Sequence, residues 1–170
     1  MEKNIKNFFK GFYFITDSKQ SKSGNINDVK NALIAGVKIV QYRNKYGTTR
    51  LLFEEANIIR NLCKDIICIS NDRVDIALAV EADGVHLGKN DLPYFVARKI
   101  LGDNKIIGLT VHNLEEAIYA EQIGANYIGV SPIFHTKTKP DAIKPIGVQI
   151  ISEIKKKVSI PVVAVGGINL

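Results

Sequence analysis

The sequence has 170 residues, of which 46% are hydrophobic and 24% charged, a balance typical of a globular domain that buries a core without disulfides or structural metals. No apolar stretch approaches the roughly 20 residues of a membrane span, and the polar first residues precede an apolar run too short for a signal peptide, so we expect a cytoplasmic protein with no membrane partner. The net charge of +6 suits anionic substrates, and because no basic run is interleaved with aromatics, nucleic acid is not an expected partner.

Seven short apolar runs rich in β-branched residues recur along the chain, with helical patterns between them. In chain order, the expected strands are 12–15, 39–40, 66–69, 84–87, 106–109, 127–130 and 161–165. The expected helices are 26–36, 48–64, 73–82, 92–101, 113–124 and 147–157, and Asn113 is the expected N-cap of the fifth. The strand runs are nearly continuous rather than alternating, which indicates a parallel sheet covered by helices on both faces.

Two architectures are compatible with this alternation, a (β/α)₈ barrel and an open doubly wound sheet. The barrel is favoured because similar phrases of small residues join helix to strand at 35–37, 82–84 and 124–126. The absence of Gly-x-Gly-x-x-Gly before the first helix also argues against a dinucleotide-binding sheet. A barrel usually needs about 250 residues. We therefore expect residues 1–170 to form a single TIM (β/α)₈ barrel domain, truncated after the seventh strand, with the eighth strand and last helices missing.

Polar residues follow the expected strands at the ends that open onto the active-site face of a parallel barrel. After the second strand, Gln41, Arg43 and Lys45 alternate, so an extended chain points all three toward one side, where they could bind phosphate oxygens. A solvated strand end is the alternative. Asp72 and Asp91 follow the third and fourth strands and could together hold Mg²⁺, although each is also placed to be a helix N-cap.

The loop after the sixth strand is long for a strand-to-helix connection. It carries Thr136, Thr138 and Lys139, whose hydroxyl and ammonium groups can donate to phosphate oxygens. Gly167 ends the seventh strand, in the region where many barrels bind phosphate through backbone amides. The alternative is a flexible surface loop.

Histidines and cysteines offer fewer candidates. His86 lies inside a strand and His112 just beyond one, and either could be a general base. For His86 a hydrogen-bonded structural role is the favoured interpretation. Cys63 and Cys68 lack further cysteines or a histidine pair at zinc spacing, so we expect buried, reduced thiols.

Together these segments resemble the thiamine-phosphate synthase family and its close relative, the thiazole tautomerase. The matching phrases lie at 13–17, 40–45, 70–79, 82–93, 111–117, 127–134, 136–139 and 161–168, in the family's order over essentially the whole chain. The resemblance implies a transferase that joins 4-amino-2-methyl-5-hydroxymethylpyrimidine diphosphate to 4-methyl-5-(2-phosphoethyl)thiazole, giving thiamine phosphate and pyrophosphate. The implied mechanism is dissociative: pyrophosphate leaves first, and the thiazole nitrogen captures the pyrimidine-methyl cation.

The resemblance also implies a role for each matching residue. The expected catalytic residues are Arg43, Lys45, Thr110 and Lys139, of which Arg43, Lys45 and Lys139 would hold the pyrophosphate. Asp72 and Asp91 would hold Mg²⁺, the expected cofactor. The remaining substrate contacts implied are Gln41 and Asn71 with the pyrimidine diphosphate, Thr110 near the pyrimidine where the family usually has Ser, and Thr136, Thr138 and backbone amides near Gly167 with the thiazole phosphate.

Two alternatives remain open beside the synthase. The tautomerase needs no Mg²⁺ and would use a histidine such as His112; it tends to lack the residues at Asp91 and Lys139, so the synthase is favoured. A non-catalytic protein or inactive remnant that binds phosphate ligands is the other alternative, because the expected barrel is incomplete. A homo-oligomer is also left open.

Overall fold

The computed structural model describes residues 8–136, 138 and 144–168, in which strands and helices alternate as expected. The strands are β1 (Tyr13–Ile15), β2 (Ile39–Tyr42), β3 (Ile67–Asn71), β4 (Gly84–Leu87), β5 (Ile106–Val111), β6 (Tyr127–Val130) and β7 (Val162–Ala164). The helices are α1 (Asn25–Ile34), α2 (Thr49–Leu62), α3 (Val74–Ala79), α4 (Tyr94–Leu101), α5 (Leu114–Gln122) and α6 (Gln149–Lys155). Each expected element is therefore confirmed, with its ends shifted by a few residues.

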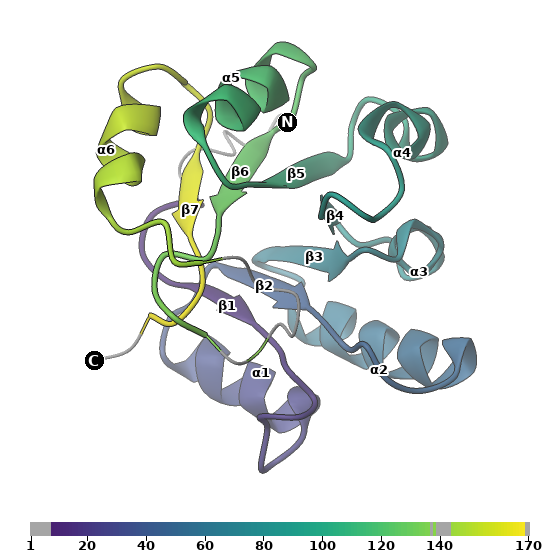
Figure 1. Ribbon diagram of the computed structural model, residues 1–170. Coiled ribbons are helices and arrows are strands. Elements are labelled where there is room, and N and C mark those ends of the chain that lie inside the picture. The colour runs from purple at the N-terminus through teal and green to yellow at the C-terminus, as the bar shows by residue number, and fades with distance from the viewer. Residues whose placement is uncertain (1–7, 137, 139–143, 169–170) are drawn as a thin grey trace.

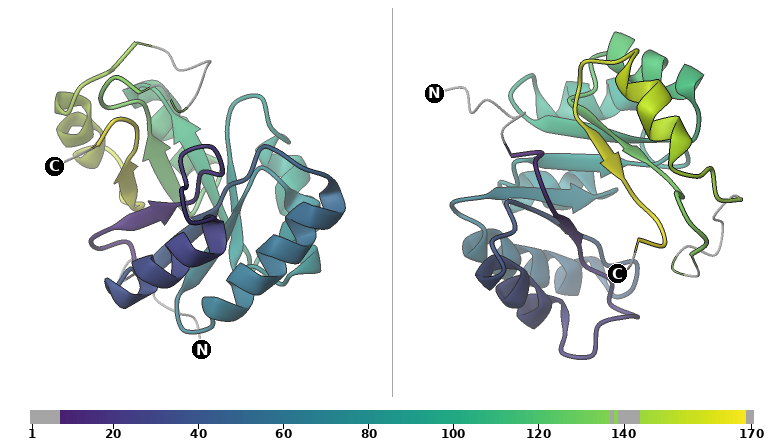
Figure 2. Two further views of the ribbon diagram at one scale, coloured as in Figure 1. Left: turned by 90° about the horizontal axis from the view of Figure 1, so that it is seen from below. Right: turned by 90° about the vertical axis from the view of Figure 1, so that its left-hand side faces the viewer.

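The seven strands form one parallel sheet that pairs in chain order from β1 to β7. The sheet curves into a nearly closed barrel, and the helices lie around its outside (Figures 1 and 2). β1 and β7 are the two edges of the sheet, and no eighth strand occurs within the described residues. The expected barrel class is confirmed, with seven of its eight strands.

Side chains of the strands alternate between the barrel interior and the layer beneath the helices. In β2, Val40 and Tyr42 belong to the large apolar cluster shared with the first helices, whereas Ile39 packs in a separate cluster with Ile67 and Ile69. All four residues of β2 are buried, as are all four of β6. Both faces of these strands are thus covered, which explains why their sequences read as continuous apolar runs.

Helix packing and capping follow from the sequence pattern. On α2, Leu52, Ala56 and Ile59 recur at helical spacing and are buried against the sheet. At the start of α5, Asn113 is the N-cap, and its side chain accepts a hydrogen bond of 2.8 Å from the backbone N–H of Glu116, as expected. Among the described residues, no helix is long and apolar enough to cross a membrane. The helices therefore serve to cover the sheet and to hold the strand ends that carry the site.

Candidate active site

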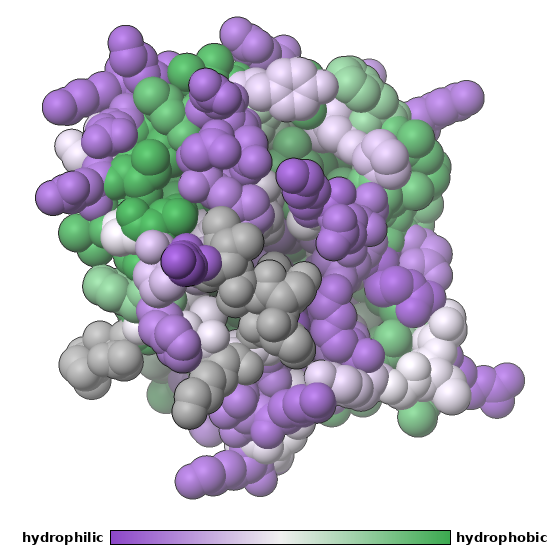
Figure 3. All heavy atoms as spheres, viewed as in Figure 1, coloured by the Kyte–Doolittle hydropathy of each residue, from purple (hydrophilic) through white to green (hydrophobic). Residues whose placement is uncertain are grey.

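A cavity of about 590 Å³ lies in the barrel and is lined by strand residues, by the loops after the strands and by residues 8–9 and 11–12 before β1. This volume is within the range of small-molecule sites in proteins, which runs from about 300 to 1,000 Å³. The residues from the sequence prediction that line it are Gln41, Arg43, Asn71, Thr110, Thr136, Thr138 and Gly167. Hydrophilic side chains gather near the middle of the face shown in Figure 3, with apolar side chains toward its upper left and upper right. The structure thus brings residues from five separate loops and strands to one cavity.

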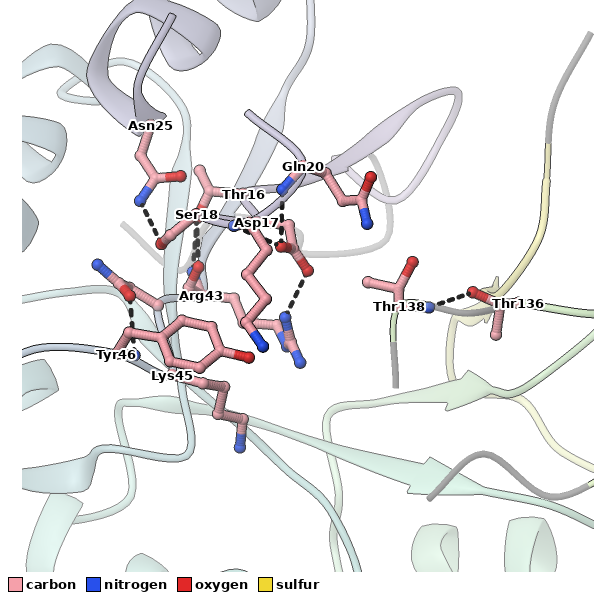
Figure 4. A network of polar contacts seen from close by, with 12 residues as sticks. Thr16, Asp17, Ser18, Gln20, Asn25, Arg43, Lys45, Tyr46, Thr136 and Thr138 are labelled. Atoms are coloured by element: carbon pink, nitrogen blue, oxygen red, sulfur yellow. Dashed lines mark hydrogen bonds and ion pairs between the residues drawn. The ribbon is translucent and has the colours of Figure 1, made fainter. Parts of the chain in front are cut away.

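Arg43 is held in place at the edge of this cavity by the end of β1. Its guanidinium Nη1 lies 2.7 Å from Asp17 Oδ2. Its backbone is also fixed, because its N–H donates to Thr16 Oγ1 at 2.7 Å and that hydroxyl donates back to the Arg43 carbonyl at 2.9 Å. Figure 4 shows Arg43 reaching Asp17, which sequence reasoning had not singled out. A guanidinium fixed in this way presents its remaining N–H groups for an anion.

Outside the cavity lining, two carboxylates and one ammonium group come together from the loops after β2, β3 and β4. Lys45 forms an ion pair with Asp72, which lies within hydrogen-bonding reach of Asp91. Burial and then the contact with Asp91 raise the pKa of Asp72 to about 6, and Lys45 opposes the shift. The described residues contain no cluster of three or more His, Cys, Asp or Glu side chains suited to a metal. Two close carboxylates with room for water or phosphate oxygens nevertheless fit the way proteins hold Mg²⁺.

The capping interpretation of these two aspartates is wrong. The N-cap of α3 is Arg73, and the N-cap of α4 is Pro93, and neither helix has a side-chain cap. Asp72 instead has a positive φ of 61°, and its carboxylate turns toward Lys45. Asp91 Oδ2 accepts a hydrogen bond of 2.6 Å from the backbone N–H of Gly88. Both carboxylates are therefore available to a cation rather than being used by a helix end.

The opposite side of the cavity is built from the loop after β6 and the end of β7. Thr136 and Thr138 line it, and the backbone N–H of Thr138 donates to Thr136 Oγ1 at 3.2 Å. Figure 4 shows these two residues across from Arg43. Gly167 has a φ of 67°, and a Cβ there would lie 2.4 Å from the His135 carbonyl oxygen, so only glycine fits between the two segments. Lys139, expected among the catalytic residues, lies outside the described residues.

Deeper in the barrel, a row of polar side chains was only partly foreseen. Gln41 and Arg43 both line the cavity, and Gln41 Nε2 donates to the Tyr13 hydroxyl at 2.8 Å. Lys45 lies beyond the end of β2 at Tyr42 and is not among the cavity-lining residues; it forms an ion pair with Asp72. His86 is hydrogen-bonded inside the barrel, as the structural interpretation expected, and it also lines the cavity.

The remaining histidine and cysteine expectations have mixed outcomes. His112 does not line the cavity; its Nδ1 lies 2.5 Å from the Ser131 carbonyl oxygen. That carbonyl can only accept, so Nδ1 carries the hydrogen and the ring is anchored to the β6 loop. Cys63 and Cys68 are buried free thiols, as expected.

Known proteins with similar sequences and structures identify the family of this chain. The family model described as thiamine monophosphate synthase matches residues 12–170. The chain belongs to this family. Both the predicted family and its transferase activity, thiamine-phosphate synthesis, are thereby confirmed at the level of the family.

Individual synthases of the family agree with this assignment. The chain is 51% identical to a thiamine-phosphate synthase from Methanosarcina barkeri, across 93% of this chain and 72% of the relative. It is 54% identical to one from Methanosarcina mazei, across 93% of this chain and 66% of the relative. A solved thiamine phosphate pyrophosphorylase from Pyrococcus furiosus superposes with a TM-score of 0.87 at 40% identity, covering 98% of this chain and 79% of the other. The chain therefore spans about two thirds to four fifths of the proteins it matches.

Proposed function

We propose that this chain couples a pyrimidine-methyl diphosphate to a thiazole phosphate at the cavity inside the barrel. The observation that carries the proposal is a cavity with the fixed guanidinium of Arg43 in its wall, together with a cluster of Lys45, Asp72 and Asp91 whose members follow the cavity-lining residues Arg43, Asn71 and His86 in the sequence. A diphosphate needs cationic donors and a divalent cation, and an organic ring needs a concave wall with a few polar groups. Both requirements are met by adjoining parts of this site.

The two substrates would occupy different sides of the site. The pyrimidine would lie in the interior against Gln41, Asn71 and Thr110, which are amide and hydroxyl groups suited to a heterocycle. Its diphosphate would extend toward Arg43 and Lys45. The thiazole phosphate would meet Thr136, Thr138 and the backbone near Gly167 on the opposite side. All of these residues except Lys45 line the cavity, which supports the division.

In the proposed reaction, the bond between the pyrimidine methylene carbon and the diphosphate oxygen breaks, and its electron pair leaves with pyrophosphate. The thiazole nitrogen lone pair then forms the new carbon–nitrogen bond. Arg43 and Lys45 would stabilise the charge on the leaving pyrophosphate because they are held close to where it develops. Lys139 would assist from the sixth loop. Asp72 and Asp91 would hold Mg²⁺, which supplies further charge neutralisation to a departing diphosphate when bound.

Location and partners follow the same proposal. The net charge of +6 would serve to attract two phosphorylated substrates rather than nucleic acid. Two buried free thiols fit a reducing cytoplasm, where phosphorylated intermediates are kept. Sedimentation of the purified chain distinguishes a monomer from the homo-oligomer that the sequence left open.

The test mixes this chain with the two phosphorylated substrates and Mg²⁺, and measures thiamine phosphate and pyrophosphate together. Equal amounts of both products are expected; isomerisation of the thiazole phosphate without coupling would point to a tautomerase instead. Calorimetry with pyrophosphate adds a readout that needs no turnover. Binding should require Mg²⁺ and be lost in Asp72→Ala, whereas Asp75→Ala, which removes an exposed carboxylate on α3, should bind normally. Pyrophosphate that fails to bind in either condition would contradict the proposal.

A further inference from the structure

Five side chains from five strands form one continuous line of hydrogen bonds through the barrel interior. Gln41 Nε2 donates to the Tyr13 hydroxyl at 2.8 Å, and the hydroxyls of Tyr13 and Tyr127 are 2.7 Å apart. The Tyr127 hydroxyl lies 2.9 Å from His86 Nδ1, and His86 Nε2 lies 2.8 Å from Thr110 Oγ1. We call these five residues the interior relay. Gln41, Tyr13, Tyr127, His86 and Thr110 all line the cavity, so the relay is part of its wall.

Two glycines on neighbouring strands make room for the rings of the relay. Gly108 of β5 is the register partner of Tyr127, and a Cβ on Gly108 would lie 2.0 Å from Cζ of that ring. A Cβ on Gly129 of β6 would lie 3.0 Å from Cε1 of His86. Tyr127 is only 1% exposed. The ring positions are therefore fixed by the backbones beside them, which is what a relay with constant hydrogen-bond lengths requires.

The tyrosines of the relay keep their hydrogens. Burial raises the pKa of both Tyr13 and Tyr127 well above the ordinary value of tyrosine. Each hydroxyl thus has one hydrogen to give and can also accept. The order in which these hydrogens point is then decided by the ends of the line.

The Gln41 end sets that order. Since the amide nitrogen donates to Tyr13, the Tyr13 hydroxyl must pass its own hydrogen to another acceptor, and within the described residues Tyr127 is the partner that remains. Tyr127 then donates to His86 Nδ1, and the neutral imidazole carries its hydrogen on Nε2 and donates it to Thr110 Oγ1. The opposite order would leave the buried Tyr13 hydroxyl hydrogen without an acceptor.

We propose that the interior relay holds His86 as the neutral Nε2–H tautomer and so turns the hydroxyl hydrogen of Thr110 toward the cavity. Thr110 already accepts from His86, and no other partner of its hydroxyl is found in the described chain, so its own hydrogen is available to a ligand. The matching ligand group is an acceptor nitrogen in an aromatic ring. This last step rests on the proposed function, in which a pyrimidine lies against Thr110. Tyr13 and Tyr127 are positioning residues, because they act through His86 and Thr110.

Nuclear magnetic resonance tests the tautomer without any substrate. The chain has only three histidines, so ¹⁵N-histidine labelling gives few signals, and His86→Gln identifies those of His86. At about pH 8, above the ordinary histidine pKa of about 6.5, two-bond nitrogen–proton correlations should show a single Nε2–H form. Tyr127→Phe should shift the Nδ1 resonance and mix the tautomers. Tyr94→Phe is the control, because its hydroxyl donates to the Gly124 carbonyl outside the barrel.

Two outcomes of that experiment overturn the relay. One is an Nδ1–H tautomer in the unmodified chain, and the other is a His86 spectrum that Tyr127→Phe leaves unchanged. If Tyr127→Phe does not fold, Thr110→Val provides the same readout from the other end, because it removes the acceptor of Nε2–H while nearly preserving shape. These results stand whether or not the chain proves to be a synthase.

Ligand binding tests whether the Thr110 hydroxyl donates its hydrogen to the ligand. Thr110→Val should weaken binding of the pyrimidine diphosphate about ten-fold, Thr110→Ser should restore it, and pyrophosphate alone should bind all three proteins equally. If Thr110→Val and the unmodified chain bind the pyrimidine diphosphate equally, the Thr110 hydroxyl does not donate its hydrogen to the ligand, and this part of the proposal is wrong. A chain that binds no pyrimidine diphosphate at all would refute the proposed function, and the tautomer experiment would still decide the relay.

Discussion

The interior of the barrel and its mouth use polar residues in opposite ways. Inside, the relay from Gln41 to Thr110 is neutral, buried or half-buried, and hydrogen-bonded at every step. At the mouth, Arg43, Lys45 and Asp72 carry full charges that are only partly buried, and two carboxylates stand side by side. Apart from the hydroxyl hydrogen of Thr110, the described interior is hydrogen-bonded without a ligand, whereas the mouth contains charges that a bound anion and cation would balance.

This difference assigns different tasks to the two regions. Satisfied neutral groups in a low-dielectric interior fix positions at little cost, and they are suited to reading the shape and hydrogen bonding of a ring. Unbalanced charges cost stability in the free protein but interact strongly with charged ligands. Substitutions in the two regions should therefore differ: those at the mouth should mainly lower activity, whereas those that displace the rings inside should mainly lower stability.

The largest effect is expected for Arg43→Ala at the mouth. Removing the guanidinium takes away a positioned donor for the leaving pyrophosphate, and kcat/KM for coupling should fall about 100- to 1,000-fold. Arg43→Lys should recover only part of this loss, because an ammonium cannot reproduce the fixed fork of donors. Arg50→Ala, an exposed change on α2, is the control for general loss of positive charge. A similar fall in Arg50→Ala would mean that Arg43 acts only through long-range attraction.

Inside the barrel, the expected large effect is on stability. Gly108→Ala would place its Cβ 2.0 Å from the Tyr127 ring, so the two strands must move apart, at a cost of about 1–3 kcal/mol or more. Gly129→Ala meets His86 at 3.0 Å and should cost less. Chemical unfolding of both variants measures which substitution lowers the free energy of unfolding more. Equal stabilities would show that the Tyr127 ring can shift, which would weaken the argument that glycines fix the relay.

The sequence predicted the mouth better than the interior. Asp72 follows β3 directly and Asp91 lies in the loop after β4, where the carboxyl ends of a parallel barrel converge, so their meeting could be foreseen from order alone. The interior relay could not, because strands buried on both faces show no alternation that separates inward from outward residues. The register that pairs Gly108 with Tyr127 exists only in the folded sheet.

Some features of the sequence nevertheless pointed to contacts inside the barrel. Gly108 and Gly129 interrupt apolar strand runs, and a glycine inside a strand often marks the close approach of another group. Asp17, two residues past the end of β1, could also have been matched with Arg43, which follows the next strand, β2. What the sequence lacked was the partner of each group, which depends on the curvature and stagger of the sheet.

Mg²⁺ binding at the mouth should raise the free energy of unfolding by less than Gly108→Ala lowers it. A cation that binds the folded chain stabilises it by RT ln(1 + [L]/Kd), or about 1.4 kcal/mol at ten times Kd. Thermal unfolding with added Mg²⁺ should show an upward shift of several degrees, and Asp91→Asn should remove most of it. A shift that persists in the double variant Asp72→Asn, Asp91→Asn would place the cation elsewhere.

The smallest expected effect comes from the charge of Asp72 itself. Its pKa is raised to about 6 in the folded chain, from an ordinary value of 3.8, by burial and by Asp91. Between these two pH values the folded state binds a proton that the unfolded state has released, so stability falls as pH rises through this window and the loss is complete above it. Asp72→Asn should therefore unfold at higher temperature than the unmodified chain at about pH 8 and with little difference at about pH 4. After discounting for partial exposure and for Lys45, the gain is about 1 kcal/mol, or roughly 2–4 °C.

Asp75, three residues after Asp72, is a control whose ionisation has the opposite effect on stability. Arg73 lowers the pKa of Asp75 through a hydrogen-bonded ion pair, so ionisation of this carboxylate favours the folded state. Asp75→Asn should thus lower the unfolding temperature slightly at about pH 8, where Asp72→Asn raises it. Saturating Mg²⁺ should then reverse the ranking of Asp72→Asn and the unmodified chain, because only the latter retains both carboxylates. If both Asn variants change stability in the same direction, the mouth carries no charge imbalance for a ligand to relieve.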